Sequence, residues 1–402
     1  MVSKKMMKLG KNRSSMRDLF DFGLEQAKIV GKENVFDFSI GNPSVPPPDA
    51  VGDAFMEVLT QPPLLVHGYT PAVGCDEARD AVAAHLTKLL NRPFGRRNVY
   101  ITCGAAAALM ASLKGFCIDN ESEFIVFAPF FPEYRCFVES AGGVLRVVPP
   151  EDDRFQINFA ALEETINEHT QAVIVNTPNN PTGAVYTKEV LQKLGDLLRR
   201  KSKEYGHVIY IISDEPYREL VYDDIEVAFV PDHYENTIVC YSYSKTLSLP
   251  GDRIGYMCVP DSMEDFDEVC WATAGAARAM GYVCAPAIMQ RVIARCADVP
   301  ANKEAYAQNR KLLYEGLTAF GYDCVYPDGA FYLFVRAPGG NAKEFCDRAK
   351  QLNLLVVPGD DFGCPTHFRV SYCVKPEMIK RALPLFEKLI KIDKIKILFR
   401  KI

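Results

Sequence analysis

The chain has 402 residues, of which 48% are hydrophobic and 24% charged, and its formal net charge is −5. This composition is typical of a globular protein long enough for two domains, and the mildly acidic balance excludes a surface built to attract nucleic acid or anionic lipid. The 13 cysteines form no C-x-x-C pair, the 6 histidines form no H-x-x-x-H pair and the longest apolar runs are strand-length, so neither a metal site nor a membrane span is expected.

The chain begins with a basic segment, residues 1–16, that lacks the apolar core of a signal peptide. Together with cysteines that show no disulfide framework, this predicts a cytoplasmic protein with free thiols. Residues 1–50 as a whole are expected to form an N-terminal arm and to complete part of a small domain.

From about residue 98 to residue 260, short apolar runs alternate with amphipathic segments. This alternation predicts an α/β domain, residues 51–290, with a mostly parallel sheet covered by helices on both faces. The clearest helix is residues 188–205, rich in Leu, Lys, Arg and Glu. The predicted strands are 98–102, 123–127, 144–148, 172–176, 208–212 and 238–241.

After about residue 290 the pattern changes to a long helix, several short strands and a final helix. We expect residues 291–402 to form a smaller α+β domain. The tail, residues 391–402, continues a basic amphipathic pattern and is expected to be a solvated helix end. The predicted elements are a helix over 302–320, strands at 331–335, 354–357 and 368–372, and a helix that starts after Pro376.

Five polar or glycine-containing segments directly follow predicted strands. In open α/β sheets, ligands bind beyond the carboxyl ends of the strands. The five segments therefore predict one cleft in which their side chains converge. They are residues 102–107, 128–134, 176–183, 213–217 and 242–245.

The first of these segments opens into ITCGAAAALMASL, a strand end and one glycine followed by a helix of small residues. Gly104, Ala105 and Ala106 would present backbone N–H groups at a helix N-terminus, where anions bind well. The small residues are also explained by close packing of the helix on the sheet. The segment is not a G-x-G-x-x-G fingerprint, which counts against a dinucleotide enzyme.

Three further side chains end strands with chemistry that a buried site can use. Asn180, in NTPNNPTG, would point its amide into the cleft, although this segment also fits a simple tight connection. Asp214 follows the apolar run VIYII, where a carboxylate is costly without a cation, although a helix N-cap would also explain it. Lys245 follows another apolar strand, in a position from which most lysines reach solvent.

Together these groups match one cofactor, pyridoxal 5′-phosphate (PLP). The N–H groups of 104–106, with Ser242 and Arg253, could hold its phosphate. Asp214 could keep its pyridine nitrogen protonated, and Asn180 and Tyr217 could contact its phenolic oxygen. Lys245 is the amine that its aldehyde needs.

The motifs NTPNNPTG, SDEPY, SYSKTLSLPGDR and FRVS, in this order, resemble the class I/II aminotransferases of PLP fold type I, the aspartate aminotransferase superfamily. The resemblance extends from Ser39 to Arg369. It implies a large domain with a mostly parallel central sheet flanked by helices, a smaller α+β domain, and the cofactor roles assigned above. Lys245, Asp214 and Tyr217 are the expected catalytic residues.

The resemblance also assigns residues that the strand pattern does not. Phe131 corresponds to the aromatic residue stacked on the pyridine ring, and Tyr69 to a tyrosine that reaches the phosphate of the neighbouring subunit. Arg369 corresponds to the arginine that binds the substrate α-carboxylate, and Gly41 to the backbone beside it. A homodimer with shared sites is therefore implied. Phe131 departs from the usual Tyr or Trp, and alanines replace the usual hydroxyl residue in the phosphate loop.

The implied activity is transfer of an amino group from an L-amino acid to a 2-oxo acid, with 2-oxoglutarate as the expected acceptor. Lys245 would move the proton at Cα as general base and acid. The same fold also hosts β-lyases that cleave C–S bonds and decarboxylases, which share these cofactor residues. A PLP-binding regulator without turnover is a third alternative, but no helix-turn-helix precedes Val51.

One arginine bears on the substrate side chain. Some aspartate aminotransferases bind the distal carboxylate with a lysine in the phosphate loop, and Ala106 stands at that position here. Others use an arginine of the partner subunit some thirty positions after the cofactor lysine, and Arg278 lies 33 residues after Lys245. Arg278 could instead pair with a nearby acid or reach solvent from its helix.

Overall fold

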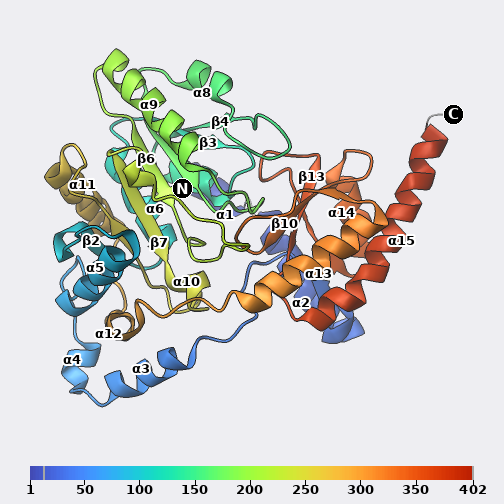
Figure 1. The fold of residues 1–402 in the computed structure, drawn as a ribbon, viewed down its shortest axis with the longest axis horizontal. Helices are drawn as coiled ribbons and strands as arrows, with labels where there is room; N and C mark the ends of the chain where they lie inside the picture. The colour runs from blue at the N-terminus through green and yellow to red at the C-terminus, as the bar shows by residue number, and fades with distance from the viewer. Residues whose placement is uncertain (12–13, 401–402) are drawn as a thin grey trace.

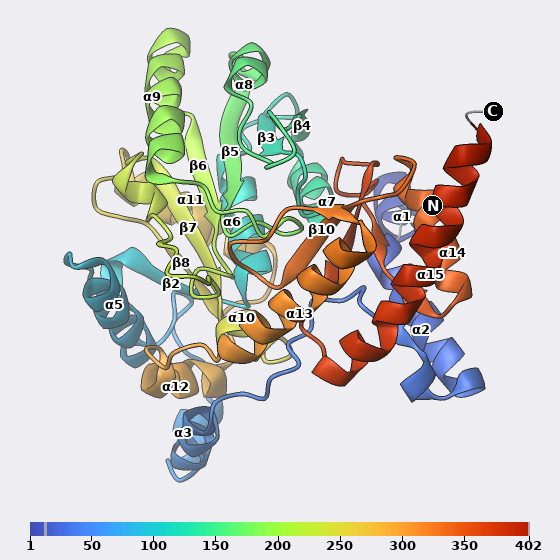
Figure 2. The ribbon, with the colours of Figure 1, turned by 45° about the vertical axis from the view of Figure 1, so that its right-hand side comes forward.

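The structure, a computed structural model, describes residues 1–11 and 14–400, with side chains to residue 393. Two bodies of sheet and helix lie side by side, one built on a large central sheet and the other on a small antiparallel sheet (Figures 1 and 2). In the described part of the chain, no helix is long and apolar enough to cross a membrane.

The large sheet has seven strands in the order β2-β8-β7-β6-β5-β3-β4, and all neighbours are parallel except that β8 runs antiparallel to β2 and β7. The strands are β2 (Val99–Thr102), β3 (Glu123–Phe127), β4 (Val144–Val148), β5 (Thr170–Asn176), β6 (Tyr210–Asp214), β7 (Thr237–Ser242) and β8 (Gly255–Cys258). Every residue of β3, β5 and β7 is buried, as expected for parallel strands covered on both faces.

Alternate residues of these strands face two different cores, because successive side chains of a strand point to opposite faces. Val126 and Ile174 pack with the helices α6 (Ala105–Phe116), α7 (Glu133–Ala141) and α11 (Phe266–Ala279). Ile125 and Val173 pack with α8 (Phe159–Thr165) and α9 (Lys188–Tyr205) on the other face. The expected α/β class is therefore confirmed.

The large body contains further helices and 3-10 turns. They are α3 (Asp49–Leu59), α4 (Pro63–His67), α5 (Asp76–Leu90), the 3-10 turns η2 (Arg96–Asn98) and η3 (Val230–Asp232), α10 (Tyr243–Thr246) and α12 (Ala287–Cys296). Helices α3, α4 and α5 pack against α12 or one another through a separate apolar cluster that includes Val58, Leu86 and Val292.

The small body is a four-stranded antiparallel sheet, β12-β13-β10-β9, with helices packed against it. Its elements are β9 (Asp323–Cys324), β10 (Tyr332–Arg336), β12 (Val357–Pro358), β13 (His367–Ser371), α13 (Glu304–Phe320), α14 (Ala342–Gln351) and α15 (Pro376–Arg400). This arrangement confirms the smaller α+β unit. The last two residues of the predicted tail, 401–402, lie outside the described residues, as do the side chains from residue 394.

The N-terminal segment joins the small body. Strand β1 (Phe36–Asp37) pairs in parallel with β11 (Leu354–Leu355), and Leu19 of α2 (Ser15–Val30) is buried in a cluster with Leu355. The segment also contains α1 (Lys4–Lys11) and the 3-10 turn η1 (Lys32–Asn34). The exact domain boundaries at residues 50 and 290 remain a prediction.

Some predicted bounds differ from the structure. The strand predicted at 208–212 is β6, Tyr210–Asp214, because its register with β5 begins at Tyr210. Asp214 is therefore the last residue of the strand and does not follow it. The strand predicted at 354–357 is two short strands, because β11 pairs with β1 and β12 pairs with β13.

Candidate functional site

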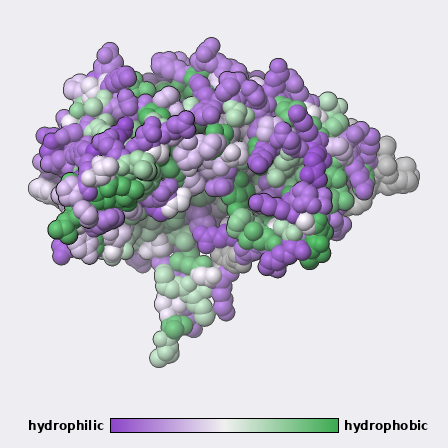
Figure 3. Space-filling model, turned by 90° about the horizontal axis from the view of Figure 1, so that it is seen from below, coloured by the Kyte–Doolittle hydropathy of each residue, from purple (hydrophilic) through white to green (hydrophobic). Residues whose placement is uncertain are grey.

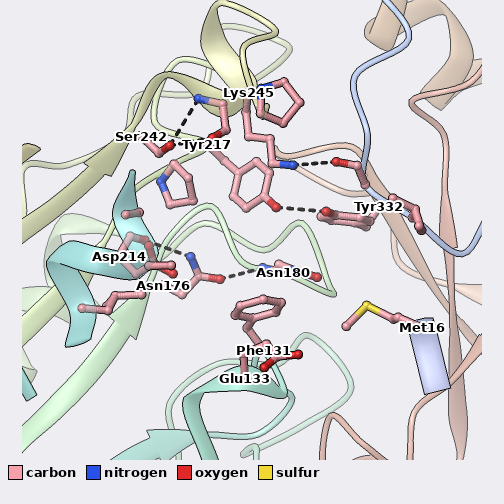
Figure 4. A pocket seen from close by; sticks show the side chains of 18 of the residues that line it. Met16, Phe131, Glu133, Asn176, Asn180, Asp214, Tyr217, Ser242, Lys245 and Tyr332 are labelled. Carbon is pink, nitrogen blue, oxygen red and sulfur yellow. Dashed lines mark hydrogen bonds between the residues drawn. The ribbon is translucent and has the colours of Figure 1, made fainter. Parts of the chain in front are cut away.

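A pocket of about 410 Å³ opens beyond the carboxyl ends of the parallel strands, between the two bodies (Figure 4). All five predicted segments contribute to its wall. The contributing residues include Ala105, Phe131, Asn180, Asp214 and Lys245. The small body adds Tyr332 and Arg369, and the N-terminal segment adds Gly41 and Met16. The structure thus brings together the cleft that the strand pattern predicts.

Lys245 lies on the short helix α10, which begins directly after β7. The Ser242 side chain caps this helix by accepting a hydrogen bond from the Ser244 backbone N–H. Lys245 Nζ donates to the Gly41 carbonyl at 2.5 Å. The pKa of Lys245 is lowered to about 8, chiefly by burial; Cys373 opposes the shift, and Arg369 and Arg253 add to it. At pH 7 about a tenth of this amine is therefore unprotonated, far more than for an ordinary lysine, and is available as a nucleophile or base.

Asp214 ends strand β6 with only 5% of its surface exposed. Its Oδ2 accepts a hydrogen bond from the Tyr134 hydroxyl at 2.5 Å, but its buried Oδ1 has no partner among the described residues. Burial raises the pKa of Asp214 to about 7, against the Tyr134 hydrogen bond, which lowers it. A cationic N–H donor placed at Oδ1 would remove most of this cost.

The N-terminus of α6 forms a cradle at one end of the pocket. Gly104 has φ +82°, and a Cβ there would lie 2.8 Å from Arg253 Nη2 and 3.3 Å from Ser242 Oγ. The N–H groups of Ala105 and Ala106, the first two residues of the helix, have no helical acceptor. Backbone carbonyls hold the Arg253 guanidinium in place. This cradle suits a compact anion such as a phosphate.

Arg369 is 1% exposed and is held without any carboxylate. Its Nη1 donates to Asn180 Oδ1 at 2.9 Å and its Nη2 donates to the Ser39 carbonyl and to Met16 Sδ. Among the described residues, its Nε has no hydrogen-bond partner and the guanidinium forms no ion pair. A buried guanidinium in this state is a receptor for an anionic ligand.

Tyr217, Asn180 and Phe131 also line the pocket (Figure 4). The Tyr217 hydroxyl is 2.9 Å from the Tyr332 hydroxyl. The Asn180 backbone N–H donates to Asn176 Oδ1 at 2.7 Å, which fixes the segment after β5. The Phe131 ring forms a wall of the pocket and makes an edge contact with Tyr134.

Two predicted site residues lie outside this pocket of the single chain. Tyr69 follows α4 and is 93% exposed. Arg278 lies in the last turn of α11, is exposed, and forms no ion pair within the described part of the chain. Both were expected to act on the partner subunit, and their roles remain predictions.

The sequence interpretation also missed residues that the structure places in or beside the pocket. Ser244 lies inside the quoted motif SYSK, so its hydroxyl, 2.7 Å from that of Ser242, could have been assigned. Tyr134, Tyr332, Met16 and Arg17 gave no comparable signal. Tyr134 lies in the predicted segment 128–134, where no pattern singles it out, whereas Tyr332, Met16 and Arg17 come from other elements and meet the site only through the tertiary fold.

The groups present fit a cofactor with an anionic group at one end and a protonatable ring nitrogen at the other. The cradle at Gly104 provides for the anion, and the unpartnered Oδ1 of Asp214 provides for the ring. Lys245 lies on the wall of the same pocket and can supply an amine. Arg369 lines the same pocket and forms no ion pair among the described residues.

Comparison with known proteins gives a match to the family model "Aminotransferase class I and II" over residues 33–385. An aromatic-amino-acid aminotransferase of Thermococcus litoralis is 30% identical over 96% of this chain and 97% of its own. An aspartate aminotransferase of Pyrococcus abyssi is 29% identical over the same shares.

Solved structures are similar as well. A crystal structure of an aminotransferase from Eubacterium rectale is 52% identical, with a TM-score of 0.95 over 97% of this chain and 98% of that one. Aspartate aminotransferase from Thermus thermophilus, solved with maleate, is 28% identical, with a TM-score of 0.85 over 97% and 99%.

Proposed function

The chain belongs to the class I and II aminotransferase family and is a transaminase, and we propose that it works with PLP bound at Lys245. Membership of this family favours transamination over the β-lyase, decarboxylase and regulator alternatives. The cofactor proposal depends on one observation. A single pocket holds a lysine amine of lowered pKa and a buried carboxylate oxygen without a partner among the described residues.

The proposed roles follow the geometry of the pocket. The cradle at 104–106 with Ser242, Ser244 and Arg253 would hold the phosphate, Asp214 the ring nitrogen and Tyr217 the phenolic oxygen. Phe131 and Asn180 would pack against the ring and contact its phenolic side. When bound, PLP supplies an aldehyde for the substrate amino group and a ring that accepts the electrons left on Cα.

The chain's own residues bind the substrate and move its protons. Arg369 binds the α-carboxylate and thereby fixes which bond at Cα faces the cofactor, with the Gly41 backbone beside it. Lys245 Nζ removes the proton from Cα. Asp214 holds the proton on the ring nitrogen. The proposed substrates are an L-amino acid and a 2-oxo acid, with 2-oxoglutarate as the acceptor. The proposed location is the cytoplasm.

A homodimer with shared sites is part of the proposal. Exposed apolar side chains of α3 and α4, Met56, Leu59, Leu64 and Leu65, lie close together along the chain. In Figure 3, green side chains gather in the left part of the visible face, where these helices lie. Apolar patches of this kind mark protein–protein interfaces. Tyr69, next to this surface, would reach the partner's phosphate.

Complementation tests the shared sites. Tyr69→Phe and Lys245→Ala homodimers should both have reduced activity, because each lacks one group in both sites. Hybrids made by mixing the two should regain activity, since one of their two sites is intact. Two results would count against shared sites. One is that verified hybrids are no more active than the mean of the two parent homodimers, and the other is that size-exclusion chromatography shows a fully active wild-type monomer.

The substrate class is proposed to be acidic. Several relatives are named aspartate aminotransferase, and the Thermus structure was solved with maleate, a dicarboxylate. Single amino acids added to the PLP-loaded protein should bleach its visible absorbance, and aspartate and glutamate should do so fastest. No spectral change with any amino acid, and no turnover with 2-oxoglutarate, would contradict the proposed function.

Arg278 of the partner is proposed to bind the distal carboxylate. Arg278→Ala should then cost about 2–5 kcal/mol in kcat/KM for aspartate, the scale for removing one member of a buried charge pair, and leave alanine nearly unaffected. Arg17 of the same chain also lines the pocket, so Arg17→Ala is the matched comparison. Equal losses for both donors in Arg278→Ala, or a selective loss only in Arg17→Ala, would remove Arg278 from this role.

A further inference from the structure

Two buried tyrosines meet inside the pocket. The hydroxyl oxygens of Tyr217 and Tyr332 are 2.9 Å apart, and the side chains are only 4% and 2% exposed. Their rings meet edge to face, with centroids 5.8 Å apart. Figure 4 shows the two hydroxyls pointing toward each other below the Lys245 amine. Tyr217 follows β6 of the large body and Tyr332 begins β10 of the small one, so this contact joins the two halves of the site.

The position of the Tyr332 hydroxyl is fixed by its surroundings. A Cβ at residue 41 would lie 2.0 Å from this oxygen, so only glycine leaves room for it. The Arg369 guanidinium lies over the Tyr332 ring, 4.4 Å from its centroid. Tyr332 therefore touches both the backbone that accepts from Lys245 and the arginine that receives the substrate carboxylate.

Either hydroxyl could donate the shared hydrogen bond, so its direction depends on where Tyr217 directs its own proton. Each hydroxyl carries one proton, and a Tyr217 that donates into the pocket has none left for Tyr332. The proton between the two oxygens must then come from Tyr332. The guanidinium of Arg369 favours this direction, because a cation over the ring makes the phenol a better donor. Burial raises the pKa of Tyr332 to about 12, and Arg369 opposes the shift.

We propose that Tyr332 is a positioning residue, which donates its hydroxyl proton to Tyr217 and so directs the Tyr217 proton into the pocket, toward the phenolic oxygen of PLP. The inference rests on the proposed function, because it assigns a contact to that cofactor. Hydrogen bonds in series strengthen one another, so Tyr217 is a stronger donor with Tyr332 behind it. The other titratable groups that face the pair are Arg369, Cys373, Asp214 and Lys245.

The test uses absorbance of the PLP-loaded enzyme. The visible band of PLP bound to a lysine changes with pH as the chromophore loses a proton. The pH at which half of this change has occurred, the midpoint, is lower when a hydrogen-bond donor contacts the phenolic oxygen. Tyr332→Phe keeps the ring and removes the hydroxyl. Its midpoint should rise by about 0.5–1 pH unit, the shift that corresponds to the free energy of one weakened hydrogen bond. An unchanged or lowered midpoint would overturn the inference, since a lowered one means that Tyr217 donated to Tyr332.

Combining variants separates positioning from a general structural effect. If Tyr332 acts through Tyr217, the midpoint of Tyr217→Phe/Tyr332→Phe should equal that of Tyr217→Phe alone, whereas additive shifts would contradict the proposal. Tyr222→Phe is the matched control. It removes another buried hydroxyl of the same core, one that donates to the Ala330 carbonyl at 2.6 Å, and should leave the midpoint unchanged.

A second variant covers the case in which Tyr332→Phe does not fold. 3-Fluorotyrosine at position 332 keeps the hydroxyl and makes it a stronger donor, so the midpoint should fall, and a rise would overturn the proposal. The two proposals fail differently. A wild-type protein without any PLP-dependent visible band would defeat the proposed function, whereas a normal wild-type midpoint that neither substitution moves would defeat the role of Tyr332 alone.

Discussion

Lys245→Ala should retain PLP but lose transamination, with the rate of Cα deprotonation lowered by about 10²- to 10⁴-fold or more, the range for removal of a general acid–base group. The physical reason is that the pocket offers no second amine, because Lys245 is the only lysine among its lining residues in the described chain. The cradle and Asp214 remain in the variant and should keep the cofactor bound without a covalent bond.

Borohydride reduction gives this prediction a readout that does not depend on turnover. In the wild-type protein, reduction should attach the cofactor covalently to the peptide that contains Lys245, and in Lys245→Ala it should attach it to none. Lys201→Ala is a suitable control, because Lys201 is also largely buried but lies on α9 and pairs with Glu204. An adduct on any other lysine would overturn the cofactor assignment.

The parts of the site that the sequence predicted share a physical cause. Asp214 and Lys245 stand where an apolar, buried run ends, so their position at the carboxyl edge of the sheet follows from the strand pattern alone. The roles of Phe131, Arg369 and Gly41 came from the family resemblance, because no local pattern distinguishes them from core residues.

The parts that the sequence did not predict depend on contacts between distant elements. Tyr332 stands in the strand YLFVR, where it looks like one more core residue, and its hydroxyl acquires a partner only when β10 meets the segment that follows β6. Tyr134 lies on α7, 80 positions before the carboxylate that it contacts. The sequence pattern did not predict strand β8 (GYMC), because four residues between turns are too few to show the hydrophobic periodicity of a strand.

Asp214→Asn should slow Cα deprotonation by about a hundredfold or more, the scale for losing one preorganised electrostatic group. The amide can still accept a hydrogen bond from Tyr134, so the local packing is preserved, but it cannot hold a proton on the ring nitrogen. Single-turnover measurements with aspartate isolate this step. A decrease of only a few-fold would mean that another group keeps the ring protonated.

The same substitution should stabilise the protein when PLP is absent, and the effect should depend on pH. The folded-state pKa of Asp214 is raised by burial to about 7 from the ordinary aspartate value of 3.8, so between these two pH values the folded state holds a proton that the unfolded chain releases. Ionisation of Asp214 therefore costs the folded state nothing below pH 3.8. The free energy of unfolding then decreases as the pH rises to about 7, by about 4 kcal/mol in total. Asparagine does not ionise and avoids this decline.

Urea unfolding of the two cofactor-free proteins at pH 5 and pH 8 measures the difference directly. The advantage of Asp214→Asn in free energy of unfolding should be larger at pH 8 than at pH 5. Asp328→Asn is the control for the kinetic experiment: it removes another carboxyl of raised pKa that does not line the pocket, and it should leave the rate of Cα deprotonation unchanged. Adding PLP should shrink or reverse the advantage, because the ring nitrogen then partners Oδ1 only in the wild type. An advantage that is equal at both pH values and unaffected by PLP would show that Asp214 carries no ionisation cost for the cofactor to relieve.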